Sequence, residues 1–193
     1  MKTIKILALL LAFLLLQGCA NGSADTLPSG WSEDWVLLGN FLGAEPLEGF
    51  SLNESKDALS VSGIYYATWT CGQAREHTND EGEKAKVYDA QIYVLVQECR
   101  SEAAAATQIG AWIARESQSY SVGEKTAHSA AGQAFDLLPL LRAKAENPYT
   151  QGIAAFASRG NIAICVELLC SEDYTGDPQA VMEAFLNGLH YND

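Results

Sequence analysis

Basic side chains are scarce in this chain of 193 residues, and its histidines are few and scattered. Lysine and arginine total 12 against 24 aspartates and glutamates, a formal net charge of −12. Such a surface repels phosphate backbones, so nucleic-acid binding is not expected. The histidines, His77, His128 and His190, are too far apart to form a His-Glu-x-x-His zinc motif.

No apolar run in the first twenty residues is long enough to span a bilayer. The run 6–16 holds 11 residues, and as a helix it would extend about 16 Å, roughly half of the ~30 Å hydrocarbon core. Lys2 and Lys5 precede it. A short basic start followed by a short apolar run is typical of a cleaved export signal.

The end of this run is more specific. Leu16, Gln17, Gly18 and Cys19 close it, and this segment resembles the lipobox of bacterial lipoproteins. The resemblance implies thioether lipidation of Cys19, cleavage after Gly18 and acylation of the new N-terminus. The alternative is an ordinary secreted protein that is cut near Ala20.

We therefore expect three parts: a signal peptide at 1–18, a lipidated tether at 19–30, and a single domain at 31–193. The tether contains two Gly, one Pro and several small polar residues, which is linker composition. The lipid on Cys19 would hold the domain on the extracytoplasmic side of a bacterial membrane. The 163 residues from Trp31 to Asp193 are enough for one core.

The pattern of the domain predicts an α+β fold. Strands are expected over 59–71, 87–98, 152–157 and 161–169, with a hairpin turn at Gly160. The region 120–149 is irregular in pattern and contains Pro139. We expect an antiparallel sheet of about five strands with two main helices on one face, and two β-β-α units are an open alternative.

Each expected helix has a capping residue at its start. Ser101 would cap a helix to about Ser119, and Asp177 with Pro178 would begin one that runs through Leu189. In the first helix, the small residues Ala106, Gly110 and Ala114 form a stripe at helical spacing. We expect this stripe to face the sheet, so that replacing Gly110 by Leu would overpack the contact.

Four cysteines remain after lipidation: Cys71, Cys99, Cys165 and Cys170. Neither Cys71 with Cys99 nor Cys165 with Cys170 can pair if their strands are extended, because the separations exceed the reach of a disulfide. Any bridge would therefore join the two halves of the domain. Fully reduced, buried thiols are the alternative, and no metal site or cofactor is expected.

Aromatic residues gather on two expected strands and the helix that follows them. Tyr65 and Trp69 share one face of the first of these strands, separated by Ala67. We predict them as a ligand-lining pair, with core packing as the competing interpretation. No catalytic motif is present, so no catalytic residue is assigned.

These observations favour a membrane-anchored lipoprotein with a noncatalytic binding or interaction domain. Its partner would be a small ligand, a glycan or an envelope protein, in addition to the membrane itself. Two alternatives remain: an envelope hydrolase whose site is dispersed in sequence, and a structural envelope component.

Overall fold

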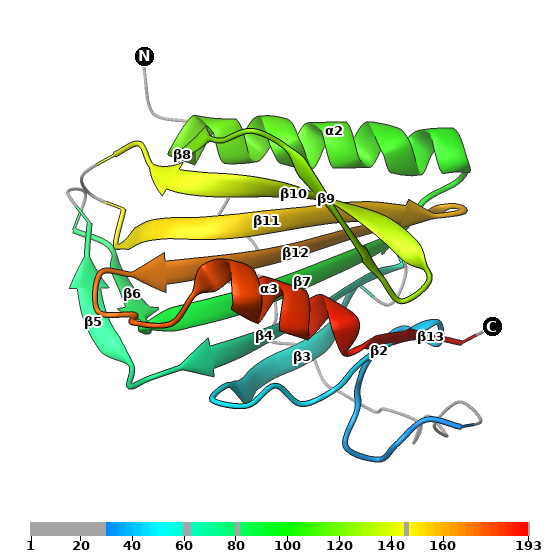
Figure 1. Cartoon of the computed structure of the whole chain (residues 1–193), viewed down its shortest axis with the longest axis horizontal. Coiled ribbons are helices and arrows are strands. Elements are labelled where there is room, and N and C mark those ends of the chain that lie inside the picture. Colours follow the sequence, from blue (N-terminus) through cyan, green and yellow to red (C-terminus); the bar gives the residue numbers. More distant parts are fainter. Residues whose placement is uncertain (1–29, 60–62, 80–81, 145–146, 193) are drawn as a thin grey trace.

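One large antiparallel sheet dominates the protein. A computed structural model describes residues 30–59, 63–79, 82–144 and 147–192. Within them the protein is an α+β structure, with an eight-stranded sheet, a three-stranded sheet, a two-stranded hairpin and two helices (Figure 1). The α+β prediction is confirmed, whereas the expected five strands are too few for the main sheet.

The main sheet has the order β3–β4–β7–β12–β11–β10–β8, and β9 pairs with β10 as well. Its strands are β3 (Ser51–Leu59), β4 (Ile64–Cys71), β7 (Ala90–Glu98), β8 (Tyr120–Val122), β9 (Thr126–Ala130), β10 (Gln133–Arg142), β11 (Tyr149–Arg159) and β12 (Ile162–Ser171). The three-stranded sheet joins β1 (Val36–Leu38), β2 (Leu42–Ala44) and β13 (Leu189–Tyr191), and the hairpin joins β5 (Arg75–Thr78) and β6 (Lys84–Val87).

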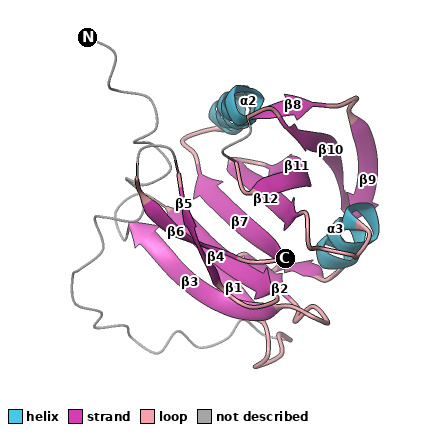
Figure 2. Cartoon of the chain, turned by 90° about the vertical axis from the view of Figure 1, so that its left-hand side faces the viewer, coloured by secondary structure: helices cyan, strands magenta, loops and turns pink. Residues whose placement is uncertain are grey.

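The helices α2 (Glu102–Ser119) and α3 (Pro178–Asn187) lie on opposite faces of the main sheet (Figure 2). Ala154 of β11 packs in a cluster with Trp112 of α2, and the next residue, Ala155, packs in a cluster with Phe185 of α3. Successive side chains of a strand point to opposite faces. The expectation of both helices on one face is therefore wrong, although the order β-β-α recurs as β4–β7–α2 and β11–β12–α3, with the β5–β6 hairpin inserted in the first.

The larger core lies between the sheet and α3, and the β1–β2–β13 sheet helps to close it. Its largest fully buried side chains include Trp69, Phe135, Ile92, Leu168, Met182 and Leu186. The smaller core lies under α2 and contains Trp112, Tyr120, Phe156 and Cys165. Both faces of the central strands β11 and β12 are thus covered, which explains their nearly continuous apolar sequence.

Capping residues mark the helix starts as the sequence predicted. The Ser101 side chain accepts a hydrogen bond from the Ala104 amide of α2, and the Asp177 side chain accepts one from the Gln179 amide of α3. Helix α3 ends at Asn187, before the expected Leu189, because Leu189 begins β13. The hairpin at Gly160 is also confirmed, with φ of +57° at this residue.

The small-residue stripe of α2 faces the solvent. Gly110 is exposed, and a Cβ atom added to it would meet nothing within 4 Å. The buried face instead carries Ala105, Trp112 and Glu116. The expected contact of Gly110 with the sheet is therefore wrong. Ile109 and Trp112 lie on the adjacent stripe of α2, and it is this stripe that packs against the sheet.

The region 120–149 forms β8, β9 and β10 despite its proline. In β10, pairing with β9 extends to Leu137 and pairing with β8 begins at Leu140. Pro139 lies between these two ladders. On the edge of β10 that faces β8 and β9, its missing N–H therefore removes no ladder hydrogen bond. Its carbonyl still accepts a hydrogen bond from the Gly123 amide, at 2.8 Å.

Candidate functional site

The predicted ligand-lining pair lies on the side of the sheet that α3 covers. Trp69 is 2% exposed, and its ring lies edge-on to that of Phe185 with 5.0 Å between centroids. Tyr65 is partly buried against the same core and meets the ring of Phe41 at 5.7 Å. The prediction of a binding site at Tyr65 and Trp69 is therefore wrong, because these side chains belong to the core.

A second aromatic pair lies on the opposite face, beside α2. Tyr66 of β4 and Tyr93 of β7 are half-buried, with 6.0 Å between ring centroids. The strand register places Thr68 beside Tyr93 on one side and Glu167 of β12 on the other. Threonine, tyrosine and glutamate therefore form one row across three neighbouring strands.

Helix α2 covers only one half of this face. It packs mainly against β8, β11 and β12, and Leu95 of β7 packs at the margin of its apolar cluster. Gln91 and Gln97 share the face of Tyr93 on β7 and are half-buried. We call the portion formed by Tyr66, Thr68, Gln91, Tyr93 and Gln97 the open face.

A buried pair of carboxyl groups lies under α2 next to the open face. Glu116 is 4% exposed and Glu167 is 9% exposed, and Glu116 lies near enough to Glu167 to affect the pKa of its carboxyl group. Arg115 donates from Nε and Nη2 to Glu116 Oε1 at 3.0 and 2.8 Å. Because the Arg115 side chain is 40% exposed, these contacts connect the sheet interior with the protein surface.

Burial and neighbouring charge together shift the protonation of this cluster. Burial, reinforced by Glu116, raises the pKa of Glu167 well above its ordinary value, and Arg115 opposes this only partly. Burial alone would lower the pKa of Arg115, but the ion pair and hydrogen bonds with Glu116, together with the nearby Glu167, outweigh burial and raise it. Burial also raises the pKa of Tyr93 to about 12. The Glu167 carboxyl group is therefore harder to ionise than a glutamate in water.

Sequence reasoning missed Glu116, Glu167 and Arg115 as a cluster. One signal for it is present: Glu167 is the single charged residue in the apolar run 162–170. A charge in such a strand needs a partner, since an isolated buried carboxylate is costly. The partner on α2 could not be identified, because the predicted helix orientation turned the wrong stripe toward the sheet.

The four described cysteines are free thiols. Cys71 and Cys170 both pair with Ala90 from opposite sides of β7, so their Cα atoms are two strand spacings apart, about 10 Å. A disulfide requires about 7 Å or less. Cys165 is buried under α2, and Cys99 packs at the margin of the same cluster. The reduced alternative therefore describes these four residues.

Two histidines lie near the C-terminal end of α3. His128 Nε2 is 3.2 Å from Asn187 Oδ1, and His190 Nε2 is 2.9 Å from Glu45 Oε1. The His190 ring also stacks on Trp35 at 4.2 Å. These contacts are with amide, carboxylate and indole groups, so in the described residues neither histidine forms a Ser–His or Cys–His pair. No group of three or more potential metal ligands occurs among those residues.

Two surface hollows, of about 180 and 580 Å³, also meet near Asn187. The larger follows the turn 129–134, and the smaller lies between residues 45–47 and the end of α3. The larger hollow is lined mainly by small residues of the turn, whereas Leu47 and Phe185 contribute to the wall of the smaller one. The open face brings more hydrogen-bonding and aromatic side chains together, so it is the stronger candidate site.

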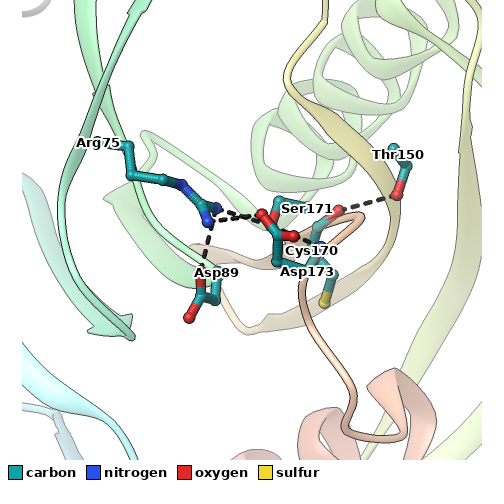
Figure 3. A network of polar contacts seen from close by, with 6 residues as sticks. All are labelled: Arg75, Asp89, Thr150, Cys170, Ser171 and Asp173. Atoms are coloured by element: carbon teal, nitrogen blue, oxygen red, sulfur yellow. Dashed lines mark hydrogen bonds and ion pairs between the residues drawn. The ribbon is translucent and has the colours of Figure 1, made fainter.

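A polar network holds the β5–β6 hairpin at one end of the sheet (Figure 3). Arg75 of β5 contacts Asp89 at 3.0 Å and Asp173 at 2.6 Å, and it donates to Ser171 Oγ at 3.2 Å. These partners precede β7 and end or follow β12. One arginine thereby fixes the hairpin to two strands of the sheet.

Comparisons with known proteins add little to this picture. No protein-family model matches the sequence, and no curated protein sequence matches it. Among solved structures, the fold resembles the solution structure of cyanobacterial PsbP (CyanoP) from Synechocystis sp. PCC 6803. The identity is 14%, the match covers 91% of this chain and 98% of that chain, and the TM-score is 0.48.

The described residues do not include the proposed lipidation site. Cys19, the signal peptide and nearly all of the tether lie outside them. In the described part, no helix combines the length and apolar character needed to cross a membrane.

Proposed function

We propose that this protein is a membrane-anchored, extracytoplasmic lipoprotein whose domain binds a partner without catalysing a reaction. The lipobox-like segment that ends at Cys19 supports the anchor. The open face supports the binding role, and one observation carries it: Tyr66 and Tyr93 are only partly buried, on a part of the sheet beyond the main contacts of α2.

The chemistry of the open face favours an extended glycan. The two tyrosine rings offer apolar surfaces with polar tips on which sugar rings can stack. The amides of Gln91 and Gln97 can both donate to and accept from hydroxyl and N-acetyl groups. Since the face is a sheet surface rather than a closed cavity, it suits a flat, chain-like ligand.

Calorimetric titration with a β-1,4-linked N-acetylglucosamine hexasaccharide tests this binding role. Wild-type protein should bind, and Tyr66→Ala or Tyr93→Ala should each weaken binding about tenfold, because one aromatic contact contributes about 1–1.5 kcal/mol. Tyr65→Ala, on the opposite face, is the matched control and should retain the affinity. Absence of binding by wild type, or equal loss in the control, would reject the glycan assignment.

Mass spectrometry of membrane fractions tests the anchor. Cys19→Ala should yield an uncleaved precursor without lipid, because in the lipoprotein pathway the thioether forms before cleavage. Cys99→Ala is the control and should be processed normally. A mature wild-type chain that starts at Asn21 or later, with no acyl mass, would show an ordinary secreted protein instead.

A further inference from the structure

A buried tyrosine holds the side-chain amide of Gln91 at one end of the open face. The Tyr149 hydroxyl donates a hydrogen bond to Gln91 Oε1 at 3.2 Å. Tyr149 belongs to β11 and Gln91 to β7, so this bond crosses the intervening strand β12. An amide of the open face is thereby tied to a strand against which α2 packs.

Tyr149 is itself held in place by the surrounding structure. It is 8% exposed, its backbone amide donates to Asn147 Oδ1 at 3.0 Å, and it pairs with Ser171 of β12. Burial raises the pKa of the Tyr149 hydroxyl to about 12, so the phenol keeps its proton at neutral pH and can act as a donor. The carbonyl oxygen of Gln91 therefore meets a donor in a fixed position.

We infer that Tyr149 positions the Gln91 amide so that its Nε2 hydrogens serve the ligand, and that the group selected there is the acetamido carbonyl of an N-acetyl sugar. A side-chain amide has one carbonyl branch and one NH₂ branch. With Oε1 bound to Tyr149, the NH₂ branch is turned away from that tyrosine and is available as a donor. This inference rests on the proposed glycan binding and names the sugar group that the open face distinguishes.

The charge of the protein and the spacing along β7 favour an acetamido group as the acceptor. A carboxylate also accepts hydrogen bonds, but the net charge of −12 disfavours an anionic ligand. Gln91 and Tyr93 share one face of β7 and are two residues apart, which places their Cα atoms about 7 Å from each other. A sugar ring stacked on Tyr93 would therefore carry its acetamido group toward Gln91.

Calorimetric titration with two hexasaccharides tests this selection. One is β-1,4-linked N-acetylglucosamine and the other β-1,4-linked glucose, which has a hydroxyl in place of each acetamido group. Wild type should prefer the first, and Tyr149→Phe and Gln91→Glu should each reduce that preference about tenfold, the effect of losing one hydrogen bond. Gln97→Glu, on the same face of β7, is the matched control and should retain the preference. Equal affinity of wild type for both sugars, an unchanged preference in Tyr149→Phe, or an equal loss in Gln97→Glu would overturn the inference.

NMR relaxation of the side-chain amides tests the positioning role without a sugar. The Gln91 NH₂ group should have high order parameters in wild type and lower ones in Tyr149→Phe, whereas the Gln97 group should not change. A mobile Gln91 amide in wild type, or one that Tyr149→Phe leaves unchanged, would contradict positioning by Tyr149. Failure of wild type to bind either hexasaccharide would reject the glycan assignment and the selected sugar group with it, while the relaxation result separately decides whether Tyr149 orients Gln91.

Discussion

The ring of Trp69 lies edge-on to that of Phe185, with 5.0 Å between their centroids. This contact joins β4 to α3, which are more than a hundred residues apart in the chain. It seals one face of the sheet, and it leaves the opposite face, with Tyr66 and Tyr93, as the place where aromatic side chains reach the surface.

Trp69→Ala should destabilise the fold by about 3–5 kcal/mol, because it removes a fully enclosed indole and leaves a cavity under α3. Urea unfolding measures the change. Tyr66→Ala, on the open face, is the comparison and should cost clearly less. A small effect of Trp69→Ala would mean that this face is not the core.

Gly110→Ala should stabilise the protein by about 0.5–1 kcal/mol, because Gly110 is an exposed position in the middle of α2 and alanine has the higher helix propensity. Ala105→Leu, on the buried face of the same helix, should instead cost about 1–3 kcal/mol through overpacking. Thermal or urea unfolding of the two variants distinguishes the faces of α2. Destabilisation by Gly110→Ala would contradict the observed orientation.

Ala131→Asn should stabilise the β9–β10 hairpin. Ala131 has φ of +50° and is followed by Gly132 at +74°, the pattern of a two-residue turn in which asparagine followed by glycine is preferred. Relief of the left-handed strain of alanine should contribute about 0.5–1 kcal/mol. The same change at Ala127, an exposed strand position in β9, should be neutral or destabilising. Equal effects at both positions would argue against the turn conformation.

Arg75→Ala should free the β5–β6 hairpin without unfolding the sheet, since it removes all three contacts of Arg75 with Asp89, Ser171 and Asp173. Amide hydrogen exchange over residues 75–78 and 84–87 should become faster, with β7 and β12 unchanged. Lys84→Ala removes an exposed ion pair within the same hairpin and serves as the control, because such pairs contribute little. Unchanged exchange in Arg75→Ala would show that other contacts hold the hairpin.

Local signals in the sequence predicted the local structure well. Ser101, Asp177 with Pro178, and Gly160 mark chain positions where one residue fixes the backbone, and each was placed correctly. The strands around Pro139 could not be predicted from local pattern. Pro139 fits into β10 because it lies between the segments that pair with β8 and with β9, and this pairing depends on separate parts of the chain.

Which face each element presents was harder to predict. The alternation in β4 places Tyr65 and Trp69 on one face and Tyr66 on the other, but it does not show which face α3 covers. Likewise, the small-residue stripe of α2 and the adjacent stripe with Ile109 and Trp112 both have a composition that suits a buried face. These choices depend on contacts between β4, α2 and α3, which lie far apart in the chain and carry no local sequence signal.

An amide NMR titration of the domain with the N-acetylglucosamine hexasaccharide tests the binding role of the open face most directly. We expect the largest shifts on β4 and β7 around Tyr66, Gln91 and Tyr93, and we expect them to vanish in Tyr93→Ala. Shifts confined to the turn 129–134 and Asn187, or no shifts at all, would contradict the assignment of the open face as the binding surface.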